Sequence, residues 1–391
     1  MTRTSTPRIV DFSTHLSGPL ASQLLAEMGA DVVKVEPPRV GDGNRGLEPF
    51  IGGRGMFHLA TSSGTRSLEI STRSPHWGSV VAAAAQWADA VIVGTRPADA
   101  VARKLDFASM AELNPRLVYC LISGFGESGP WKDYLAHGQT IDALAGAVHL
   151  QWEDGLPTTA PGWRSAGAPL AGVFGALGVM SGLARQEREG CPQHVSISLW
   201  ASALWWQWRD ANCLVNLGEP WQEYRDLGSR YSMYPTSDRR AILVAPIEEK
   251  FWKRFCNLLE LPAEWIERGS WAKSGMEFGR GGGHADEKAV IAAAMRSRPL
   301  AEWWQLLSNA EVPFAPVLTL EEALTSDHAE AERIMSRTTV GETSAQMVSS
   351  PIRFADEADR TLSSPPELGQ DSASVLADFG LSPSLARDLV P

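Results

Sequence analysis

Short apolar runs and helical repeats alternate along the first 46 residues of the chain. Residues 9–12 and 32–35 form two apolar runs, and apolar residues recur at helical spacing between residues 20 and 28. Pro19 suits the first turn of this helix, and Gly29 suits its end. Because two strands joined by one helix imply a right-handed parallel crossover, the pattern predicts a βαβ unit.

The same alternation of strands and helices continues to about residue 125. We expect the further elements at residues 67–70, 77–88, 90–94, 98–105, 108–113 and 116–123. Such alternation predicts an α/β fold with a doubly wound, Rossmann-like parallel sheet. Ligands of these sheets bind beyond the carboxyl ends of the strands, so the loops at residues 13–18 and 36–45 are the expected site.

Two long apolar segments follow this sheet pattern. Residues 166–185 are rich in alanine, glycine and leucine and predict a helix, and residues 195–215 predict a second helix that contains four tryptophans. Since apolar residues fall on more than one side of the second helix, we expect it to be buried in a core or in a subunit interface.

A different pattern begins near residue 218. Its elements are a strand at 241–245 and helices at 247–259, 288–296 and 300–308. A chain of 391 residues also exceeds the size of one ordinary hydrophobic core. We therefore expect a large domain over residues 1–217, a smaller α+β domain over 218–330 and a tail over 331–391.

Composition narrows the classes of function. Hydrophobic residues make up 44% of the chain and charged residues 21%, which is typical of a soluble globular protein. No apolar run reaches the roughly 18 residues of a membrane span, and the net charge of −11 argues against a nucleic-acid partner. The N-terminus lacks the apolar segment of a signal peptide, so we expect a cytoplasmic location. The four cysteines lack metal-ligand spacing, and no metal site is expected.

Several segments resemble one known family. They are DFSTHLSGPLASQLLAEMGADVVKVEPP at residues 11–38, GDGNR at 41–45, NPRLVYCLISGFGESGPW at 114–131 and QEREGCPQHVSISLW at 186–200. In this order they resemble the family III CoA-transferases, a group that includes formyl-CoA transferase and the related α-methylacyl-CoA racemase. The resemblance implies coenzyme A thioesters and carboxylic acids as substrates, a C-terminal tail that returns to the large domain, and two chains interlocked as a dimer.

The resemblance also implies contacts with CoA. The candidate residues are His15, Arg66, Thr95, Arg96 and Arg103. An anionic nucleotide needs cationic groups near the strand ends, which the three arginines would supply. Any one of them read alone is equally well explained as a solvated surface charge.

The family nucleophile is missing. In the resembling transferases an aspartate four residues before a glycine attacks the thioester, and Ala168, four residues before Gly172, stands at that place. A methyl group cannot act as a nucleophile. His137 matches the histidine of the racemases but lacks the same aspartate as its partner, and Asp142 is the nearest relocated carboxylate. We expect Asp142 to be an exposed helix carboxylate.

Three functions remain open. The leading interpretation is a subunit of a heteromeric CoA-transferase whose partner supplies the carboxylate. Some members of the family resemble this arrangement, including those that activate aromatic succinates. The second is an autonomous acyl-CoA isomerase, lyase or hydrolase that uses His137. The third is a non-enzymatic protein that binds acyl-CoA. The acyl group, the donor and the acceptor are not specified by the sequence.

Overall fold

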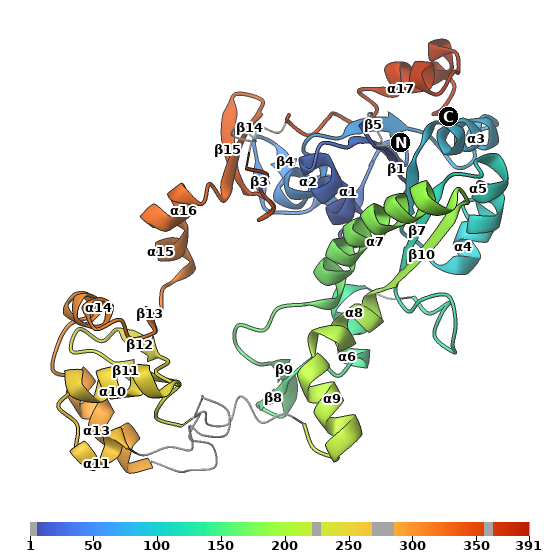
Figure 1. Ribbon diagram of the computed structural model, residues 1–391. Coiled ribbons are helices and arrows are strands. Elements are labelled where there is room, and N and C mark those ends of the chain that lie inside the picture. Colours follow the sequence, from blue (N-terminus) through green and yellow to red (C-terminus); the bar gives the residue numbers. More distant parts are fainter. Residues whose placement is uncertain (1–5, 136, 221–227, 268–284, 356–362, 391) are drawn as a thin grey trace. The chain divides into compact units, whose positions relative to one another are not determined.

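The computed structural model describes residues 6–135, 137–220, 228–267, 285–355 and 363–390 of the chain. Contacts within the chain divide it into two compact units. The first comprises Met1–Trp208 with Glu330–Pro391, and the second comprises Arg209–Ala329. Figure 1 labels the helices and strands of both units, which are described separately below.

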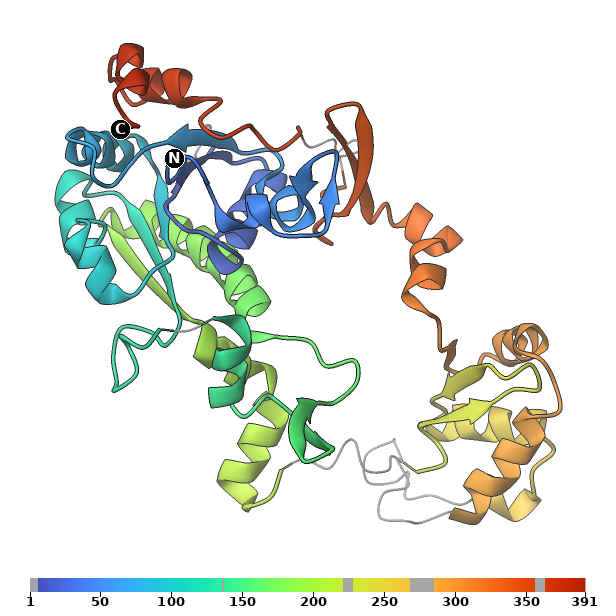
Figure 2. The same ribbon diagram turned by 180° about the vertical axis from the view of Figure 1, so that it is seen from behind.

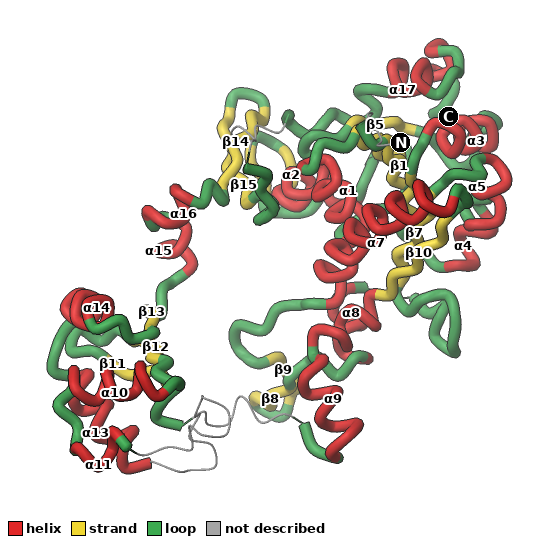
Figure 3. Tube along the Cα trace, viewed as in Figure 1, coloured by secondary structure: helices red, strands yellow, loops and turns green. Residues whose placement is uncertain are grey.

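A six-stranded parallel sheet forms the centre of the first unit, with the strand order β10-β7-β6-β1-β2-β5. Its strands, yellow in Figure 3, are β1 (Arg8–Asp11), β2 (Asp31–Glu36), β5 (Arg66–Glu69), β6 (Ala90–Val93), β7 (Val118–Ser123) and β10 (Gln193–Ser198). Five of these six strands lie where the apolar pattern predicts them. The doubly wound α/β fold is thereby confirmed.

The sixth strand corrects the expectation of one helix over residues 195–215. Val195 and Ile197 lie in β10, which pairs in parallel with β7. The hydroxyl of Ser198 then accepts a hydrogen bond from Ala201 N at 3.2 Å and so begins α8 (Leu199–Trp206), which α9 (Trp208–Leu217) follows. The alternation of β-branched residues before Ser198 is a strand pattern, and the N-cap marks the change to helix.

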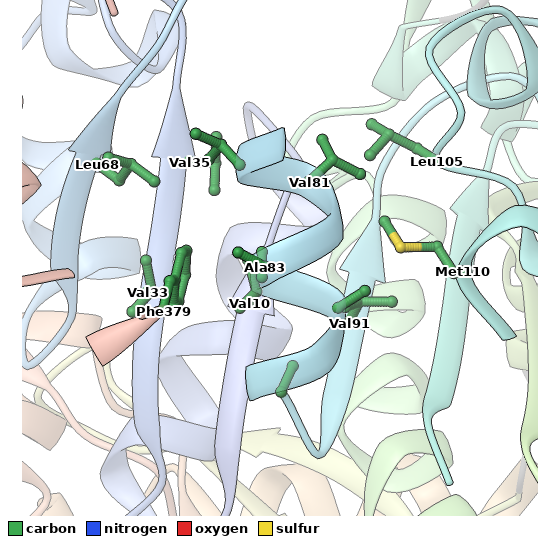
Figure 4. Packing of buried hydrophobic residues seen from close by; sticks show 14 of the residues in the cluster. Val10, Val33, Val35, Leu68, Val81, Ala83, Val91, Leu105, Met110 and Phe379 are labelled. Atoms are coloured by element: carbon green, nitrogen blue, oxygen red, sulfur yellow. The ribbon is translucent and has the colours of Figure 1, made fainter. Parts of the chain in front are cut away.

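Alternate residues of the strands pack against helices on opposite faces of the sheet. Val10 and its neighbours pack with α3 (Trp77–Trp87) and α5 (Phe107–Leu113), whereas Ile9 and its neighbours pack with α1 (Ser17–Glu27) and α7 (Gly167–Glu189). Figure 4 shows part of the first cluster, in which Phe379 from the C-terminal tail lies near Val33. This three-layer arrangement is that of a doubly wound sheet.

By length and composition alone, helix α7 could cross a membrane. Half of its most apolar 18-residue stretch, however, is buried within the protein. Glycines allow this close packing. A Cβ atom at Gly172 would lie 2.8 Å from the Ser17 carbonyl oxygen, and one at Gly175 would lie 2.7 Å from Ile122 Cδ1. The helix therefore packs against α1 and the sheet as a core helix does.

The C-terminal tail returns to the large unit, which confirms the expectation drawn from the resemblance. Asp371 accepts a hydrogen bond from Ser67 N at 2.9 Å, and α17 (Ser372–Asp378) covers the edge strand β5, as Figures 1 and 2 show from two sides. The tail also contains the hairpin of β14 (Met335–Val340) and β15 (Thr343–Val348), which the sequence reading missed. Covering the strand edge protects it from pairing with other chains.

The second unit is a smaller α+β body. Its antiparallel sheet contains β11 (Ser232–Pro235), β12 (Ala241–Val244) and β13 (Phe314–Pro316) in that order. The helices α10 (Glu249–Leu258), α13 (Ala285–Met295) and α14 (Leu300–Asn309) contribute buried apolar residues to one core with this sheet. Trp252, Trp265 and Trp303 are the largest side chains of that core.

A buried histidine lies beneath the loops at the ends of β1 and β2. His58, on α2 (Met56–Ser62), is 1% exposed, and within the described part of the chain neither of its ring nitrogens has a hydrogen-bond partner. Burial, and then the nearby charge of Arg45, lower the pKa of His58 from 6.5 to about 4. The folded protein therefore holds this side chain neutral.

We expect His58 to make folding stability depend on pH. The pKa of His58 is lower in the folded chain than in the unfolded chain. Its contribution to the free energy of unfolding is therefore fully present above pH 6.5 and is lost as the pH falls toward 4, and it amounts to about 3 kcal/mol in total. His58→Leu, of similar volume, should flatten the free energy of unfolding between pH 6.5 and 4.5. Urea denaturation across this range measures the slope. An unchanged slope in the variant would assign the pH dependence to other groups.

Candidate functional site

A cavity of about 400 Å³ opens at the carboxyl ends of β1, β6 and β7. The residues that line it are Thr14, His15, Leu16, Ser17, Gly18, Gly94, Thr95, Arg96, Asp99, Ile122, Ser123, Gly124, Tyr134, Leu135, His137, Gly138, Ile141, Ala168 and Leu199. The topology of the parallel sheet places the site here, because all carboxyl strand ends meet at one edge. Five residues singled out from the sequence meet in this cavity: His15, Thr95, Arg96, His137 and Ala168.

Several helices begin at the wall of the cavity. Ser17 and Gly18 open α1, Gly138 opens α6 (Gly138–Leu144), and Ala168 is the second residue of α7. The amino end of a helix carries partial positive charge and free backbone N–H groups. The cavity wall thus favours anionic groups such as carboxylates, thiolates and phosphates.

His15 is held by its backbone in the loop after β1. It adopts a φ of 70°, in the left-handed region that is unusual for a residue with a side chain. Its N–H donates to Asp42 Oδ1 at 3.0 Å, and its carbonyl accepts from the side-chain amide of Asn44. The loop that contains the GDGNR segment therefore fixes the conformation from which the His15 ring reaches the cavity.

A buried lysine supports this loop. Lys34 is 1% exposed, and its Nζ lies 2.9 Å from Asp42 Oδ2 and 3.3 Å from Asp11 Oδ2. It also donates to the carbonyl oxygen of Ser13 at 3.0 Å. Burial alone would lower the pKa of Lys34, but the two carboxylates outweigh burial and raise it. The ammonium group remains charged and joins the end of β1 to the loop after β2.

Arg96 lines the cavity together with a carboxylate that the sequence reading missed. Its guanidinium donates to Asp99 at 2.7 and 3.2 Å and to the Asp133 carbonyl oxygen at 3.2 Å. The hydrogen bond from Arg96 lowers the pKa of Asp99 below its usual value. The spacing in the sequence could have indicated this ion pair, because Arg96 and Asp99 are three residues apart at the start of a helix.

His137 lies beside His15 in the lining of the cavity. It precedes α6, where its backbone N–H donates to Thr140 Oγ1 at 3.0 Å. The ring centroids of His137 and His15 are 6.4 Å apart at an angle of 66°. The backbone of His137 thus caps the helix while its ring faces the second imidazole.

Ala168 brings no reactive group to this wall. It is 5% exposed and belongs to the first turn of α7. Of the residues that the structure describes along the cavity, Asp99 is the one carboxylic acid, and it is paired with Arg96. Across the described residues no cluster of three or more histidine, cysteine, aspartate or glutamate side chains could hold a metal ion.

Two predicted arginines do not line the cavity. Arg66 is the first residue of β5, so it lies at the amino ends of the strands, where it pairs with Asp31 at 2.8 Å and Asp378 at 2.6 Å. Arg103 follows α4 (Pro97–Ala102), and its carbonyl oxygen accepts from Trp77 Nε1 at 3.1 Å. A contact of either residue with CoA stays a prediction.

Asp142 differs from the exposed carboxylate that we expected. Its side chain is fully buried and accepts hydrogen bonds from Gly167 N at 2.9 Å and from the Ser165 hydroxyl. Helical spacing from His137 did not reveal this, because the partners come from a segment more than 20 residues later. Asp142 is therefore a buried link between α6 and α7.

Comparisons with known proteins agree with this architecture. A CaiB/BaiF family protein from Brucella suis superposes with a TM-score of 0.77 at 22% identity, over 95% of this chain and 98% of that chain. Rv3272 from Mycobacterium tuberculosis gives a TM-score of 0.80 at 23% identity, over 95% and 98% of the two chains. At this level of identity the likeness establishes the fold.

Curated relatives cover nearly the whole chain. Succinate–glutarate CoA-transferase from Agrobacterium fabrum is 28% identical over 95% of this chain and 94% of its own length. Acetyl-CoA:oxalate CoA-transferase from Acetobacter aceti is 23% identical over 95% and 94%. The succinyl-CoA–L-malate CoA-transferase beta subunit from Chloroflexus aurantiacus is 25% identical over 83% and 81%. The family model of CoA-transferase family III matches residues 5–372, and the chain belongs to this family.

Proposed function

We propose that this chain is the CoA-binding subunit of a heteromeric CoA-transferase whose partner chain supplies the carboxylate that carries the acyl group. One observation carries the proposal: Ala168 lines the cavity, and the resemblance assigns to this position the aspartate of the transferases. The scaffold, the cavity and the helix N-termini are present, whereas the group that would form the covalent intermediate is absent from this position.

The geometry of the cavity supports a role in binding an acyl-CoA thioester. Its volume of about 400 Å³ fits part of a CoA ester, with the remainder of the ligand over the open mouth. Arg96 would contact an anionic group of CoA, and His15 and His137 would flank the thioester end. The first turns of α1 and α7 would stabilise negative charge that develops on the thioester oxygen.

Asp99 does not replace the missing nucleophile. Its two carboxylate oxygens both accept hydrogen bonds from Arg96, and its pKa is lowered by that contact. A carboxylate stabilised in this way is a weaker nucleophile, since the electron pairs that would attack are shared with the guanidinium group.

Two observations support a protein partner. Among the relatives, the Chloroflexus protein is a beta subunit by name. In the first unit, Trp205 and Trp206 of α8 are 54% and 62% exposed, and Trp152 of the β8–β9 hairpin (residues 150–159) is 69% exposed. Of the two places expected for the tryptophan segment, a core or a subunit interface, this exposure argues against the core and favours the interface. Exposed aromatic clusters of this kind mark interaction surfaces.

A second candidate function is an autonomous isomerisation at the α-carbon of an acyl-CoA. It is favoured by the two imidazoles, His15 and His137, whose ring centroids are 6.4 Å apart in the lining of the cavity. One imidazole can remove the α-proton as a base and return it as an acid, with the second imidazole beside it. Exchange of the α-proton for deuterium in D₂O, abolished by His137→Ala, would favour this candidate over the first.

We expect Arg96→Ala to weaken the binding of CoA about tenfold, because a charge-assisted hydrogen bond contributes roughly 1.5–3 kcal/mol. The matched control is Arg185→Ala, which removes an exposed arginine that pairs with Glu189 near the end of α7, outside the cavity lining, and should change the affinity less than about twofold. Isothermal titration with CoA at two salt concentrations measures both variants. Equal affinities for the two variants would contradict the assignment of Arg96.

We expect Ala168→Asp to gain a covalent reaction that the natural chain lacks. With succinyl-CoA the variant should release about one CoA per chain in a burst, since the new carboxylate stands where the family carries its nucleophile. Ala168→Asn has the same shape without the charge and should release none. Free thiol measured by stopped flow distinguishes the variants. Multiple turnovers by the unaltered chain alone would disprove the proposed division of labour.

A further inference from the structure

We infer that Asp142 is a positioning residue, which holds the His137 side of the cavity against the first turn of α7. The inference rests on the proposed function, because it concerns the same cavity. Asp142 lies on α6 and has no exposed surface. Its place outside the cavity lining means that it acts through its neighbours and not on the substrate.

The two carboxylate oxygens of Asp142 have separate partners at the beginning of α7. Oδ1 accepts from Gly167 N at 2.9 Å, and Oδ2 accepts from the hydroxyl of Ser165. Ala168, which lines the cavity, is the residue after Gly167. The side chain of Asp142 thus fixes the backbone immediately before the position at which the family has its nucleophile.

Helix α6 depends on such contacts for its placement. It has seven residues, too few for an isolated helix to be stable in water. Its C-terminal end is held by α8, where Trp200 Nε1 donates to the Leu144 carbonyl oxygen at 3.2 Å and Gln207 Nε2 donates to that of Ala145 at 3.1 Å. Asp142 adds the contact with α7, so α6 is fixed on two sides while His137 at its beginning faces the cavity.

Gly167 leaves space for this contact because it has no Cβ atom. A Cβ atom there would lie 3.1 Å from Asp142 Oδ1 and 2.9 Å from the Leu199 carbonyl oxygen. A side chain at this position would push α6 and α8 away from α7. Glycine therefore leaves room for the hydrogen bond between Gly167 N and the carboxylate.

The negative charge of Asp142 is stabilised by the helix rather than by a cation. Among the described residues, no lysine or arginine nitrogen lies within 4 Å of its carboxylate. The amino end of the 23-residue helix α7 and the two hydrogen bonds stabilise the buried carboxylate instead. Because both oxygens are occupied and buried, Asp142 is also excluded as a relocated nucleophile.

The test compares two substitutions that differ in hydrogen bonding. Asp142→Asn keeps an oxygen for Gly167 N and an amide for Ser165, so it should bind CoA within about threefold of the natural chain. Asp142→Ala removes both contacts and should weaken CoA binding at least tenfold. It should also shift the imidazole NMR resonances of His137 and His15 in histidine-labelled protein. All measurements are made well below the melting temperature of each variant.

A matched control separates positioning from general stability. Asp106 caps α5 in the same manner, through Ser109 N at 3.1 Å and Ser109 Oγ at 2.8 Å, but lies outside the cavity. Asp106→Ala should lower the melting temperature and leave CoA affinity and the His137 resonances unchanged. If Asp142→Ala behaves like this control, the inference is overturned. If the natural chain binds no CoA while Asp142→Ala still shifts the His137 resonances, the proposed function fails and the positioning role stands.

Discussion

The site depends on the ion pairs and the hydrogen bond of one buried lysine ammonium group. Lys34 lies between Asp11 and Asp42 with no appreciable exposure, and it also binds the backbone of the loop after β1. Removing one member of such a cluster leaves an uncompensated buried charge, which costs several kcal/mol. The cluster joins the ends of β1 and β2. It thereby fixes the loops from which His15 reaches the cavity.

The cavity combines the fold of the family with an alanine in its wall. The parallel sheet brings the carboxyl strand ends and several helix N-termini to one place, which favours anionic ligands. Ala168 lines this cavity, and the resemblance assigns its position to the carboxylate of the family. We therefore propose that binding and covalent chemistry are divided between two chains. The half-exposed tryptophans of α8 are consistent with a second chain that covers them.

Local patterns predicted the fold well and the side-chain partners poorly. Five of the six strands could be predicted, because a parallel strand that is buried on both faces forms a continuous run of apolar residues. The strand β10 was taken for helix, since its short alternation is followed at once by a helical segment. The burial of Asp142 could not be deduced, because its partners lie more than 20 residues away. Arg66 was assigned to the nucleotide by motif position; its ion pairs with Asp31 and Asp378 could not be deduced from the sequence, and its contact with CoA stays a prediction.

We propose that the carboxylate which carries the acyl group belongs to another chain. The most direct measurement is peptide mass spectrometry of the complex purified with its partner, after reaction with an acyl-CoA and trapping of the intermediate with hydroxylamine. We expect a modified aspartate or glutamate in a peptide of the partner and none in this chain. A modified carboxylate in this chain, at Asp99 or elsewhere, would contradict it.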